Sequence, residues 1–445
     1  MSFKEQRLED LCELVIDCPH STPKWTDKGF IVLRNQNIRN GVLDLSAPSF
    51  TDEDGYKSRI KRAKPRVNDI VFTREAPMGE VCLIPKGIDC CLGQRQVLLR
   101  ANNEIDPYYL FWALQSPYVQ HQISWNEGTG TTVSNVRIPV LKDLKIPRLG
   151  GHESWIAKTM TSLALKSQIN EKINQTLEQM AQALFKSWFV DFEPVKVKMA
   201  ALEVGGSQED ATRAAMTAIS GKDADALAVY EREHPEQYAE LKATAELFPS
   251  AMRESELGEI PEGWSSQRLS NIATLHYGKA LKKTERIEGP YPVYGSGGIT
   301  GSHISYLVEG PSIIVGRKGS IGTLYWEDEK FHPIDTVYYV SNKDGVPLSY
   351  LYYLMETLNL SSMNTDAAVP GLNRDNVYRL EVLKPIQSIL NKFNNHISAI
   401  RNMIQKNNLS TATLTTLRDT LLPKLLSGEI TLPEAELVIS EAENV

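Results

Sequence analysis

Two stretches of the chain carry apolar residues mostly three or four positions apart. The first runs from Glu153 to about Phe189, and the second runs from Ile386 to about Leu422, where we expect Pro423 and then Gly428 to end it. This spacing predicts two amphipathic helices of about 37 residues, each about 55 Å long at about 1.5 Å per residue. The apolar positions are Ile156, Met160, Leu163, Ile169, Ile173, Leu177, Met180, Leu184 and Trp188 in the first stretch, and Ile389, Phe393, Ile397, Ile400, Ile404, Leu414, Leu417 and Leu421 in the second.

A single helix of this length with one apolar stripe is poorly suited to water, so we expect the two stripes to bury each other as an antiparallel coiled coil. Polar residues interrupt both stripes: Asn170 and Asn174 in the first, and Asn407 and Asn408 in the second. Buried asparagines would fix the register of the pair at a cost in stability. The alternative is that these side chains face solvent.

The segments before the two helices repeat one another in order. The string QRL at Gln6 returns at Gln267, and DIVFTREAPMGEV parallels SIIVGRKGSIGTL, with Arg74 matching Arg317. YLFWAL parallels YLYYLM, and SNVRIPVLKDLKIP parallels DNVYRLEVLKPI. Short β-branched and aromatic runs broken by Gly, Pro and Asn predict a compact α+β domain for each copy. The chain is therefore an internal repeat with pseudo-two-fold architecture.

The negative charge of the chain is concentrated between the two copies. Residues 196–262 hold 7 Lys and Arg against 14 Asp and Glu, which equals the net charge of −7 for the whole chain. Blocks such as EDATRAAMTAIS predict helices here, so the segment is an acidic helical linker or insertion. The acidic total therefore says little about the charge of faces elsewhere, and binding to nucleic acid depends on where cations cluster.

The number and spacing of the cysteines predict reduced thiols, and the hydropathy of the chain predicts no membrane span. The five cysteines are odd in number and lack the usual spacing of zinc ligands, so reduced thiols are favoured over disulfides or a metal site. No apolar run approaches the roughly 18 to 20 residues of a membrane span, and the start lacks a signal-peptide apolar region. We therefore expect a cytoplasmic protein. The cysteines are Cys12, Cys18, Cys82, Cys90 and Cys91.

The strongest basic cluster is KSRIKRAKPR, beginning at Lys57. Six cations in ten residues would neutralise several phosphates and make binding steeply dependent on salt. A merely solvated loop is the alternative interpretation. The residues predicted to contact phosphate are Arg59, Lys61, Arg62, Lys64 and Arg66.

Two polar turns of the first copy carry side chains suited to reading bases. Arg suits guanine, and Asn and Gln suit adenine, because each presents paired hydrogen-bonding groups. Ordinary turn chemistry explains Asn at these places equally well. The candidates are Arg34, Asn35, Gln36 and Asn37 on one turn, Gln94 and Arg95 on the other, and Arg74 within the repeated motif.

The two copies diverge most in the loop before their last strand. The first copy has GTGTTVSN, with hydroxyl and backbone donors at Thr131 and Thr132, whereas the second has MNTDAAVPGLNRDN, with Asn373 and Arg374. Domains that read different sequences should share strands and differ in such loops. Further candidates in the second copy are Lys279, Lys282, Lys283, Tyr294, Ser296, Arg317 and Lys318.

Motifs of catalytic proteins are missing from the sequence. YGSGGITG lacks the GKS/T ending of a P-loop and does not open a helix, so it is interpreted as a turn. There is no Asp/Asn-Pro-Pro-aromatic tetrapeptide of the kind that amino-methyltransferases use, and the eight histidines form no ligand-spaced pair. Glu240 in ELK fits the end of a nuclease motif, but it lies on a predicted helix without a suitable upstream aspartate in a strand.

The most specific strings are LEQMAQALFKSWFVDFEP from Leu177, SELGEIPEGW from Ser255 and LRDTLLPKLLSGEI from Leu417. With these strings the chain resembles the specificity subunits of type I restriction-modification systems over nearly its whole length. The first copy departs from the pattern because it begins at MSFKEQRL without the SELGEIPEGW lead.

The resemblance implies a non-catalytic protein with two target-recognition domains, each reading one half of a split sequence in double-stranded DNA. The long helices would set the gap between the halves and dock two methyltransferase subunits, and restriction subunits would join the same assembly. No cofactor is expected on this chain; S-adenosylmethionine, ATP and Mg²⁺ belong to the partner subunits. A helix of about 55 Å corresponds to about one and a half turns of B-DNA.

The expected boundaries are 1–150 and 263–385 for the two recognition domains, 151–195 and 386–430 for the spacer helices, 196–262 for the acidic linker and 431–445 for a tail. Two other hypotheses remain open. A self-contained DNA-modification enzyme would need a cofactor loop and a catalytic tetrapeptide. A coiled-coil adaptor without sequence specificity would leave the two diverged domains unexplained.

Overall fold

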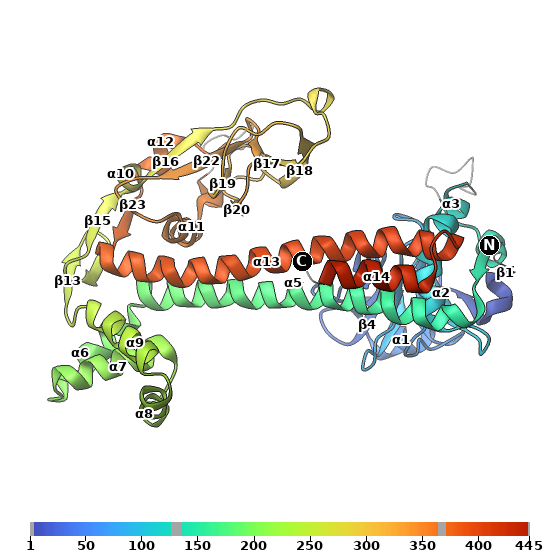
Figure 1. The fold of residues 1–445 in the computed structure, drawn as a ribbon, viewed down its shortest axis with the longest axis horizontal. Coiled ribbons are helices and arrows are strands. Elements are labelled where there is room, and N and C mark those ends of the chain that lie inside the picture. The colour runs from blue at the N-terminus through green and yellow to red at the C-terminus, as the bar shows by residue number, and fades with distance from the viewer. Residues whose placement is uncertain (1–3, 126–134, 364–370, 444–445) are drawn as a thin grey trace. The chain divides into compact units, whose positions relative to one another are not determined.

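The computed structural model describes residues 4–125, 135–363 and 371–443. It divides into two compact units, one comprising Met1–Glu171 with Asn408–Val445 and the other comprising Lys172–Asn407 (Figure 1). Each unit contains one copy of the repeat and one part of each long helix. We call residues 1–150 the first copy and residues 263–385 the second copy.

The first copy is built on a sheet with the strand order β2-β11-β8-β9, in which neighbouring strands are antiparallel. Another sheet has the order β10-β4-β7-β3, with β10 parallel to β4, and the remaining described pairs are β1–β12 and β5–β6. The strands are β1 (Lys4–Arg7), β2 (Cys12–Asp17), β3 (Trp25–Thr26), β4 (Phe30–Leu33), β5 (Ile38–Arg39), β6 (Val42–Leu43), β7 (Ser49–Thr51), β8 (Ile70–Thr73), β9 (Val81–Leu83), β10 (Cys90–Leu92), β11 (Gln96–Ala101) and β12 (Lys145–Arg148).

Helices α2, α3 and α4 share a core with the β2-β11-β8-β9 sheet, whereas α1 packs on the other sheet, against β4 and β10. Helix α2 covers the β2-β11-β8-β9 sheet with a nearly continuous buried run from Tyr109 to Leu114, which explains why PYYLFWALQ is almost entirely apolar. Asp106 caps this helix by accepting from the Tyr108 amide at 2.7 Å, and Pro107 stands at its first turn, where its missing N–H is harmless. The helices are α1 (Glu53–Arg59), α2 (Pro107–Gln115), α3 (Pro117–Trp125) and α4 (Ile138–Asp143), with 3₁₀ turns η1 (Leu8–Leu11), η2 (Asn35–Asn37) and η3 (Gly150–His152).

The second copy has a main sheet of order β16-β22-β19-β20 and another of order β18-β17-β21, in which β17 and β21 are parallel. Within the copy β15 pairs with β23, and directly before the copy β13 pairs with β14 in the hairpin that carries SELGEIPEGW. The elements are β13 (Met252–Ser255), β14 (Gly258–Pro261), β15 (Ser265–Arg268), α10 (Leu269–Ile272), β16 (Ala273–Tyr277), η4 (Lys283–Glu285), β17 (Tyr291–Gly295), β18 (Gly298–His303), β19 (Ser312–Gly316), β20 (Leu324–Glu327), β21 (His332–Pro333), β22 (Val337–Asn342), α11 (Leu348–Thr357), η5 (Leu360–Ser362), α12 (Arg374–Tyr378) and β23 (Glu381–Lys384).

The internal repeat is confirmed by topology. The order β2-β11-β8-β9 in the first copy corresponds strand for strand to β16-β22-β19-β20 in the second, and β1–β12 corresponds to β15–β23. Buried tyrosines repeat as well: the Tyr109 hydroxyl donates to Pro147 O at 2.8 Å, and the Tyr350 hydroxyl donates to Leu383 O at 2.6 Å. The predicted α+β domains are therefore two versions of one fold.

Long helices α5 (Glu153–Phe189) and α13 (Gln387–Ser427) pack against each other in antiparallel directions within each unit. In the first unit Met160 and Leu163 of α5 share a core with Leu414 and Leu421 of α13. In the second unit Phe185 and Trp188 near the end of α5 share a core with Ile389, Phe393 and Ile397 near the start of α13. The two expected helices are confirmed, and the coiled coil stays a prediction.

One partly buried cation joins the helices to the second copy within the second unit. Arg401 of α13 pairs with Glu178 of α5 at 3.3 Å, and its guanidinium carbon lies 4.9 Å from the ring centroids of both Trp326 and Tyr352. Its side chain is 13% exposed. The aromatic faces and the carboxylate together compensate for the loss of water around this charge.

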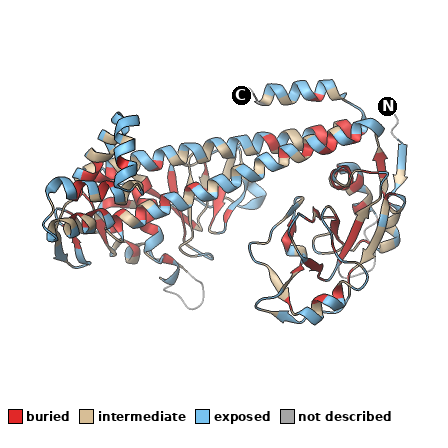
Figure 2. Cartoon of the chain, turned by 90° about the horizontal axis from the view of Figure 1, so that it is seen from below, coloured by how far each residue is buried: buried red, intermediate tan, exposed pale blue. Residues whose placement is uncertain are grey.

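The apolar stripe of α5 is only partly buried, so α13 covers some of its expected apolar positions and leaves others exposed. Ile169, Ile173 and Met180 are 55%, 40% and 56% exposed. Figure 2 shows that buried, intermediate and exposed residues alternate along the two long helices. Polar contacts occupy this part of the helix pair. The Asn170 side-chain amide donates to Ser410 Oγ at 3.3 Å in the first unit, and the Asn407 amide donates to Asn174 Oδ1 at 2.8 Å in the second.

These asparagine contacts favour the register interpretation over the solvent-facing one for Asn170, Asn174 and Asn407, because each side chain is partly buried and bonds to the opposite helix. A shift along the helix axis would break both amide bonds. Asn408, the fourth interruption, is exposed.

Pro423 does not end the second long helix, contrary to the sequence-based expectation. Helix α13 continues through it to Ser427, and Gly428 then adopts φ 73° and donates its amide to Leu425 O at 3.2 Å. Leu425 and Leu426 beyond the proline are buried in the core of the first unit. Their burial stabilises the last turn and outweighs the loss of one main-chain bond. Helix α14 (Leu432–Glu443) follows.

The acidic segment between the copies is helical as far as Leu247, as its composition predicts, but it ends in the β13–β14 hairpin, which was not expected. Its helices are α6 (Glu193–Glu203), α7 (Gln208–Ser220), α8 (Ala224–Glu233) and α9 (Pro235–Leu247). They enclose a small core of their own that includes Ala215, Met216 and Leu227. The Lys198 ammonium is buried against the carbonyls of Ala245 and Phe248, and this burial lowers its pKa.

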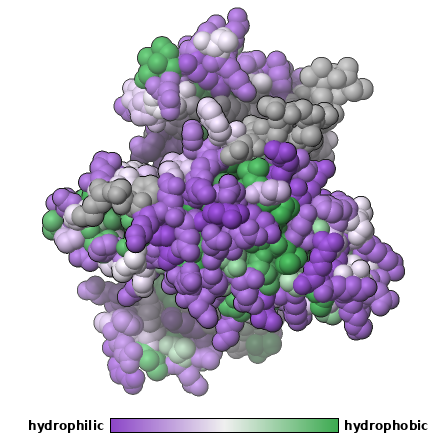
Figure 3. Space-filling model, turned by 90° about the vertical axis from the view of Figure 1, so that its right-hand side faces the viewer, coloured by the Kyte–Doolittle hydropathy of each residue, from purple (hydrophilic) through white to green (hydrophobic). Residues whose placement is uncertain are grey.

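Within the described ranges, no helix combines the length and the apolar character needed to cross a membrane. On the face drawn in Figure 3, hydrophilic residues predominate and hydrophobic residues form smaller areas.

Candidate nucleic-acid interface

The basic cluster of the first copy lies on the last turn of α1 and the loop that follows. Lys61, Arg62 and Arg66 are exposed, and no ion pair to them is found among the described residues. Lys64 is also exposed but is partly neutralised by Asp89, whose carboxylate lies 3.0 Å from its ammonium. The loop thus presents uncompensated positive charge to solvent, which is what binding of phosphate requires.

Arg59 must be removed from the predicted phosphate contacts. It is 6% exposed, and its guanidinium donates to Leu92 O at 2.9 Å, to Gly93 O at 3.3 Å and to Ser21 O. Burial lowers the pKa of this side chain. The cation therefore ties α1 to the β10 end and the loop after β2, because the carbonyls of the buried residues Leu92 and Gly93 need a donor.

We expect Arg59→Met to destabilise the first copy by about 2 to 4 kcal/mol, since it leaves buried carbonyls without a partner while keeping an apolar side chain. Salt dependence of DNA binding should stay that of the unchanged chain, because Arg59 does not reach the surface. Thermal unfolding and binding measured over a range of salt concentrations check both statements. A shallower salt dependence without loss of stability would return Arg59 to the phosphate contacts.

The turn after β4 separates two kinds of polar side chain. Arg34 is exposed, with its guanidinium carbon 5.3 Å from the Trp25 ring centroid, and Gln36 is exposed beside it. Asn37 is 4% exposed: its Oδ1 accepts from the Arg34 amide at 2.9 Å, and its amide donates to Asp44 O at 3.0 Å. These contacts favour the turn-chemistry alternative for Asn37 over base reading.

One polar atom of the Asn35 side chain is hydrogen-bonded within the first copy, and the other has no partner there. Its amide donates to Glu75 O, while its Oδ1 is buried without a hydrogen-bond partner among the described residues. An unpaired buried acceptor is costly, so this atom is suited to a donor supplied from outside the described chain.

Gln94 and Arg95 lie on the turn between β10 and β11, and both are exposed. The Gln94 amide donates to His20 O at 2.8 Å, and Arg95 pairs with Glu75 at 3.1 Å. Arg95 adopts φ 65°, which a non-glycine residue rarely does. The turn therefore holds both side chains at the surface in a constrained backbone.

Arg74 is drawn into the fold by Asp17 and is not a free cation. Its Nη1 donates to both carboxylate oxygens of Asp17 at 3.0 and 3.1 Å, and its Nε donates to Val136 O at 2.9 Å. The side chains of Arg74 and Asp17 are 14% and 20% exposed. This ion pair weighs against its assignment as a DNA contact, and we leave Arg74 out of the contacts proposed below. Thr131 and Thr132, the predicted donors of the Gly-rich loop, lie outside the described residues.

Among the second-copy candidates, Tyr294 is buried and not available. It is 6% exposed, and its hydroxyl donates to Glu327 at 2.8 Å; burial raises its pKa. Ser296 is half-buried, and its carbonyl accepts from the Thr323 hydroxyl at 2.7 Å. YGSGGITG forms the turn between β17 and β18, which confirms its interpretation as a turn. Lys279, Lys282 and Lys283 are exposed.

Arg317 and Arg374 come together around one aromatic ring. Their guanidinium carbons each lie 4.8 Å from the centroid of Tyr277, which is 46% exposed. Lys318 is exposed next to Arg317, and Asn373 caps α12 by accepting from the Asp375 amide at 2.8 Å. Two sequence-predicted cations from different segments therefore meet, around a tyrosine that the sequence analysis missed.

Neither a reactive thiol nor a metal site is found among the described residues. The five cysteines are free, and burial raises the pKa of Cys12 and Cys90 to about 12 and that of Cys91 to about 11, so these thiols are poor nucleophiles at neutral pH. Among the described residues, no three His, Cys, Asp or Glu side chains group as metal ligands.

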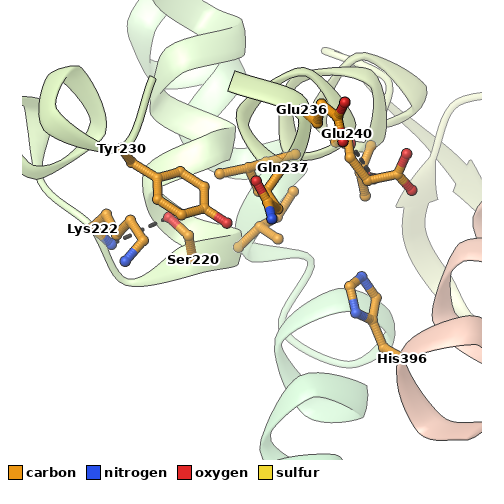
Figure 4. Close-up of a pocket in the computed structure, with 10 residues that line it drawn as sticks. Ser220, Lys222, Tyr230, Glu236, Gln237, Glu240 and His396 are labelled. Carbon is orange, nitrogen blue, oxygen red and sulfur yellow. Dashed lines mark hydrogen bonds between the residues drawn. The ribbon is translucent and has the colours of Figure 1, made fainter. Parts of the chain in front are cut away.

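A pocket of about 450 Å³ lies beside α9 in the second unit, and its lining residues include none of the residues predicted to contact DNA. Figure 4 shows the residues that line it, with Tyr230, Gln237 and Glu240 on the insertion helices and His396 on α13. Glu240 pairs with Lys392. It lies on α9 and has a structural partner, so the resemblance of ELK to a nuclease motif has no support in its surroundings.

Comparison with known proteins gives a family match over most of the chain. Residues 2–179 and 261–412 match the model described as the type I restriction modification DNA specificity domain. The matched ranges are the two copies with parts of the long helices.

Two curated relatives and one solved structure agree with that match. The HindI specificity subunit of Haemophilus influenzae is 32% identical over 305 residues, which cover 62% of this chain and 66% of that relative, slightly less than two thirds of its length. The MjaIX specificity subunit of Methanocaldococcus jannaschii is 22% identical over 82% of this chain and 78% of its own. A type I system S subunit from M. genitalium shares the fold with a TM-score of 0.54 at 18% identity, over 96% of both chains.

Proposed function

We propose that this chain, which belongs to the type I restriction-modification DNA specificity family, is the DNA-recognition subunit of such an enzyme. Each copy would read one half of an asymmetric, split DNA sequence. The observation that carries this proposal is the pair of copies itself: the same strand order twice, with different charged side chains exposed on the loops. One scaffold presenting two different surfaces is what reading two different half-sites requires.

The side chains proposed to contact DNA are those that the structure leaves at or near the surface. Exposed cations would contact phosphates and set the register, while polar side chains on turns would read base edges. They are Arg34, Asn35, Gln36, Lys61, Arg62, Lys64, Arg66, Gln94 and Arg95 in the first copy, and Lys279, Lys282, Lys283, Ser296, Arg317, Lys318, Asn373 and Arg374 in the second.

Catalysis would belong to partner subunits. We place S-adenosylmethionine on two methyltransferase subunits, and ATP with Mg²⁺ on restriction subunits, in a cytoplasmic complex. The exposed apolar residues of α5 support a docking role. Leu165, Ile169, Ile173 and Met180 fall within one face of the helix at 3.6 residues per turn, and exposed apolar stripes mark protein interfaces.

The double substitution Ile169→Asp and Ile173→Asp is expected to release the methyltransferase subunits while the chain stays folded, because two charges would be buried without partners on docking. Co-purification from the host, followed by thermal unfolding of the chain, measures both properties. Gln175→Asp, which adds a charge at an exposed position on the opposite face of α5, is the control and should leave the complex intact. Retention of the methyltransferase by the double variant would contradict this docking surface.

Independent half-sites test the function directly. Gln36→Ala in the first copy should relax recognition in one half of the methylated motif only, and Asn373→Ala in the second copy should relax the other half only. Methylation maps from hosts that carry each variant give the result. A loss spread over both halves from either substitution would contradict the assignment of one half to each copy.

A further inference from the structure

Arg74 and Arg317 occupy the same place in the two copies. The Arg74 amide donates to Arg95 O at 2.8 Å, and the Arg317 amide donates to Thr336 O at 2.9 Å. Arg95 and Thr336 are the residues directly before the equivalent strands β11 and β22. The main-chain bonds on the other side repeat too, since Arg74 O accepts from the Val136 amide at 3.0 Å. Arg317 O likewise accepts from the Leu372 amide at 2.8 Å.

The neighbour at the end of the adjacent strand differs between the copies. Asp17 ends β2 opposite Val97, and Tyr277 ends β16 opposite Tyr338. In the first copy the Asp17 carboxylate therefore meets Arg74 and neutralises it, with two hydrogen bonds from Nη1. In the second copy a tyrosine ring stands at the equivalent position.

The guanidinium groups of the second copy have no such carboxylate. Among the described residues, no carboxylate pairs with Arg317 or Arg374. Arg317 donates to the main-chain carbonyl of Asp335 at 3.0 Å, and Arg374 donates to that of Leu275 at 3.4 Å. The Arg374 Nε is buried without a hydrogen-bond partner among the described residues.

This arrangement calls for an anion. Two like charges held around one ring repel each other, and the ring face only partly offsets that repulsion. A guanidinium is shaped to bind a carboxylate or a phosphate through paired N–H donors. The nearby Lys318 is 3.8 Å from the Asp335 carboxylate, which reduces but does not cancel the positive charge at this place.

We infer that Arg317, Tyr277 and Arg374 form a binding site for a DNA backbone phosphate, and that Asp17 fills the equivalent site of the first copy as a built-in anion. The inference rests on the proposed function, in which the chain binds DNA. Its consequence is asymmetric: the second copy uses this arginine to bind DNA, and the first copy does not.

The test compares matched variants of the full chain, recovered with its subunits, by measuring affinity for a duplex carrying the mapped methylation motif over a range of salt concentrations. Arg317→Gln should weaken binding about tenfold and flatten the slope of log affinity against log salt by about 0.9, as expected for loss of one phosphate contact. Arg74→Gln should leave the slope unchanged. Asp17→Asn should steepen it by up to about 0.9, because Arg74 is freed.

Two controls separate local from general effects. Glu13→Gln removes one negative charge from an exposed position on the same strand as Asp17, and it should not reproduce the steeper slope. Arg317→Lys keeps the charge without the paired donors, so it should keep the slope of the unchanged chain even if affinity falls. Thermal unfolding of each variant shows that the comparison is made on folded protein.

Three results would overturn the inference: equal slope changes from Arg74→Gln and Arg317→Gln, equal effects of Asp17→Asn and Glu13→Gln, or an unchanged slope in folded Arg317→Gln. A fourth concerns the source of the anion. Inorganic phosphate at matched ionic strength should not raise the melting temperature in an Arg317-dependent way, and such a rise would assign the site to a free anion. If the unchanged chain shows no preference for the motif duplex, the proposed function itself fails.

Discussion

Removing one heptad from each long helix is expected to shorten the non-specific gap in the recognised sequence while leaving both half-sites unchanged. Residues 168–174 of α5 and 406–412 of α13 are the matched segments, because Asn170 bonds to Ser410 and Asn174 bonds to Asn407. A heptad is close to two helical turns, so the remaining residues keep their faces. Its length is about 10 Å, which corresponds to at most about three base pairs at about 3.4 Å each.

Methylation mapping of a host that carries the deletion measures the gap. The control replaces the same residues by alanine in both helices, which keeps their length and should keep the gap. Altered half-sites with an unchanged gap would contradict the spacer role. The deletion could also abolish all methylation. If the host with the alanine control still methylates the motif in that case, the two copies cannot adapt to a shorter spacer, and the proposed adjustable gap is wrong.

The second large effect is expected from the loop after α1. Replacing Lys61, Arg62 and Arg66 together by Gln should flatten the slope of log affinity for DNA against log salt concentration by up to about 2.7, since each phosphate contact contributes about 0.9 to that slope. Near 0.15 M salt this amounts to a loss of affinity on the order of a hundredfold. Because phosphate contacts carry little sequence information, the motif itself should not change.

A control with the same change of net charge comes from the acidic insertion. Lys196, Arg213 and Arg232 are exposed on α6, α7 and α8, and replacing them by Gln should leave both affinity and salt dependence nearly unchanged. Equal losses from the two triple variants would show that net charge, and not this loop, governs binding. A changed motif with unchanged salt dependence would instead assign the loop to base reading.

Helix positions and the repeat were accessible from the sequence because both rest on local, periodic signals. The apolar spacing that predicts α5 says which residues share a face, but not how much of that face a single partner covers, and Ile173 and Met180 therefore turned out exposed. Pro423 was misjudged for a related reason: the leucines that hold the last turn of α13 in place gain their stability from residues far away in the chain.

Exposure of cations was the part of the site that the sequence could not settle. Arg59 and Lys61 stand two positions apart in one basic run, yet Arg59 donates inward to three carbonyls and Lys61 is exposed. Composition identifies such a cluster, whereas the direction of each side chain depends on the tertiary fold. The same holds for Asn37, whose side chain closes its own turn.

The sequence alignment of the two copies does not pair Asp17 with Tyr277, because β2 contains one residue more than β16. Matching QRL at Gln6 with QRL at Gln267 aligns Asp17 with Gly278. In the structure the register of β2 against β11 shifts between Arg100 and Ala101, so that β2 contains one extra residue, and beyond it Asp17 corresponds to Tyr277. Beyond such a bulge, an alignment without a gap pairs each residue of one copy with a residue whose side chain lies on the opposite face of the sheet in the other copy.

Mapping of methylated adenines in the host genome, with and without this chain, tests the central claim most directly. The account predicts a motif that disappears with the chain, is asymmetric, and consists of two specific parts separated by a fixed gap of unspecified bases. A continuous palindromic motif that depends on the chain, or an unchanged set of methylated sites after its removal, would contradict the claim that each copy reads one half of a split sequence.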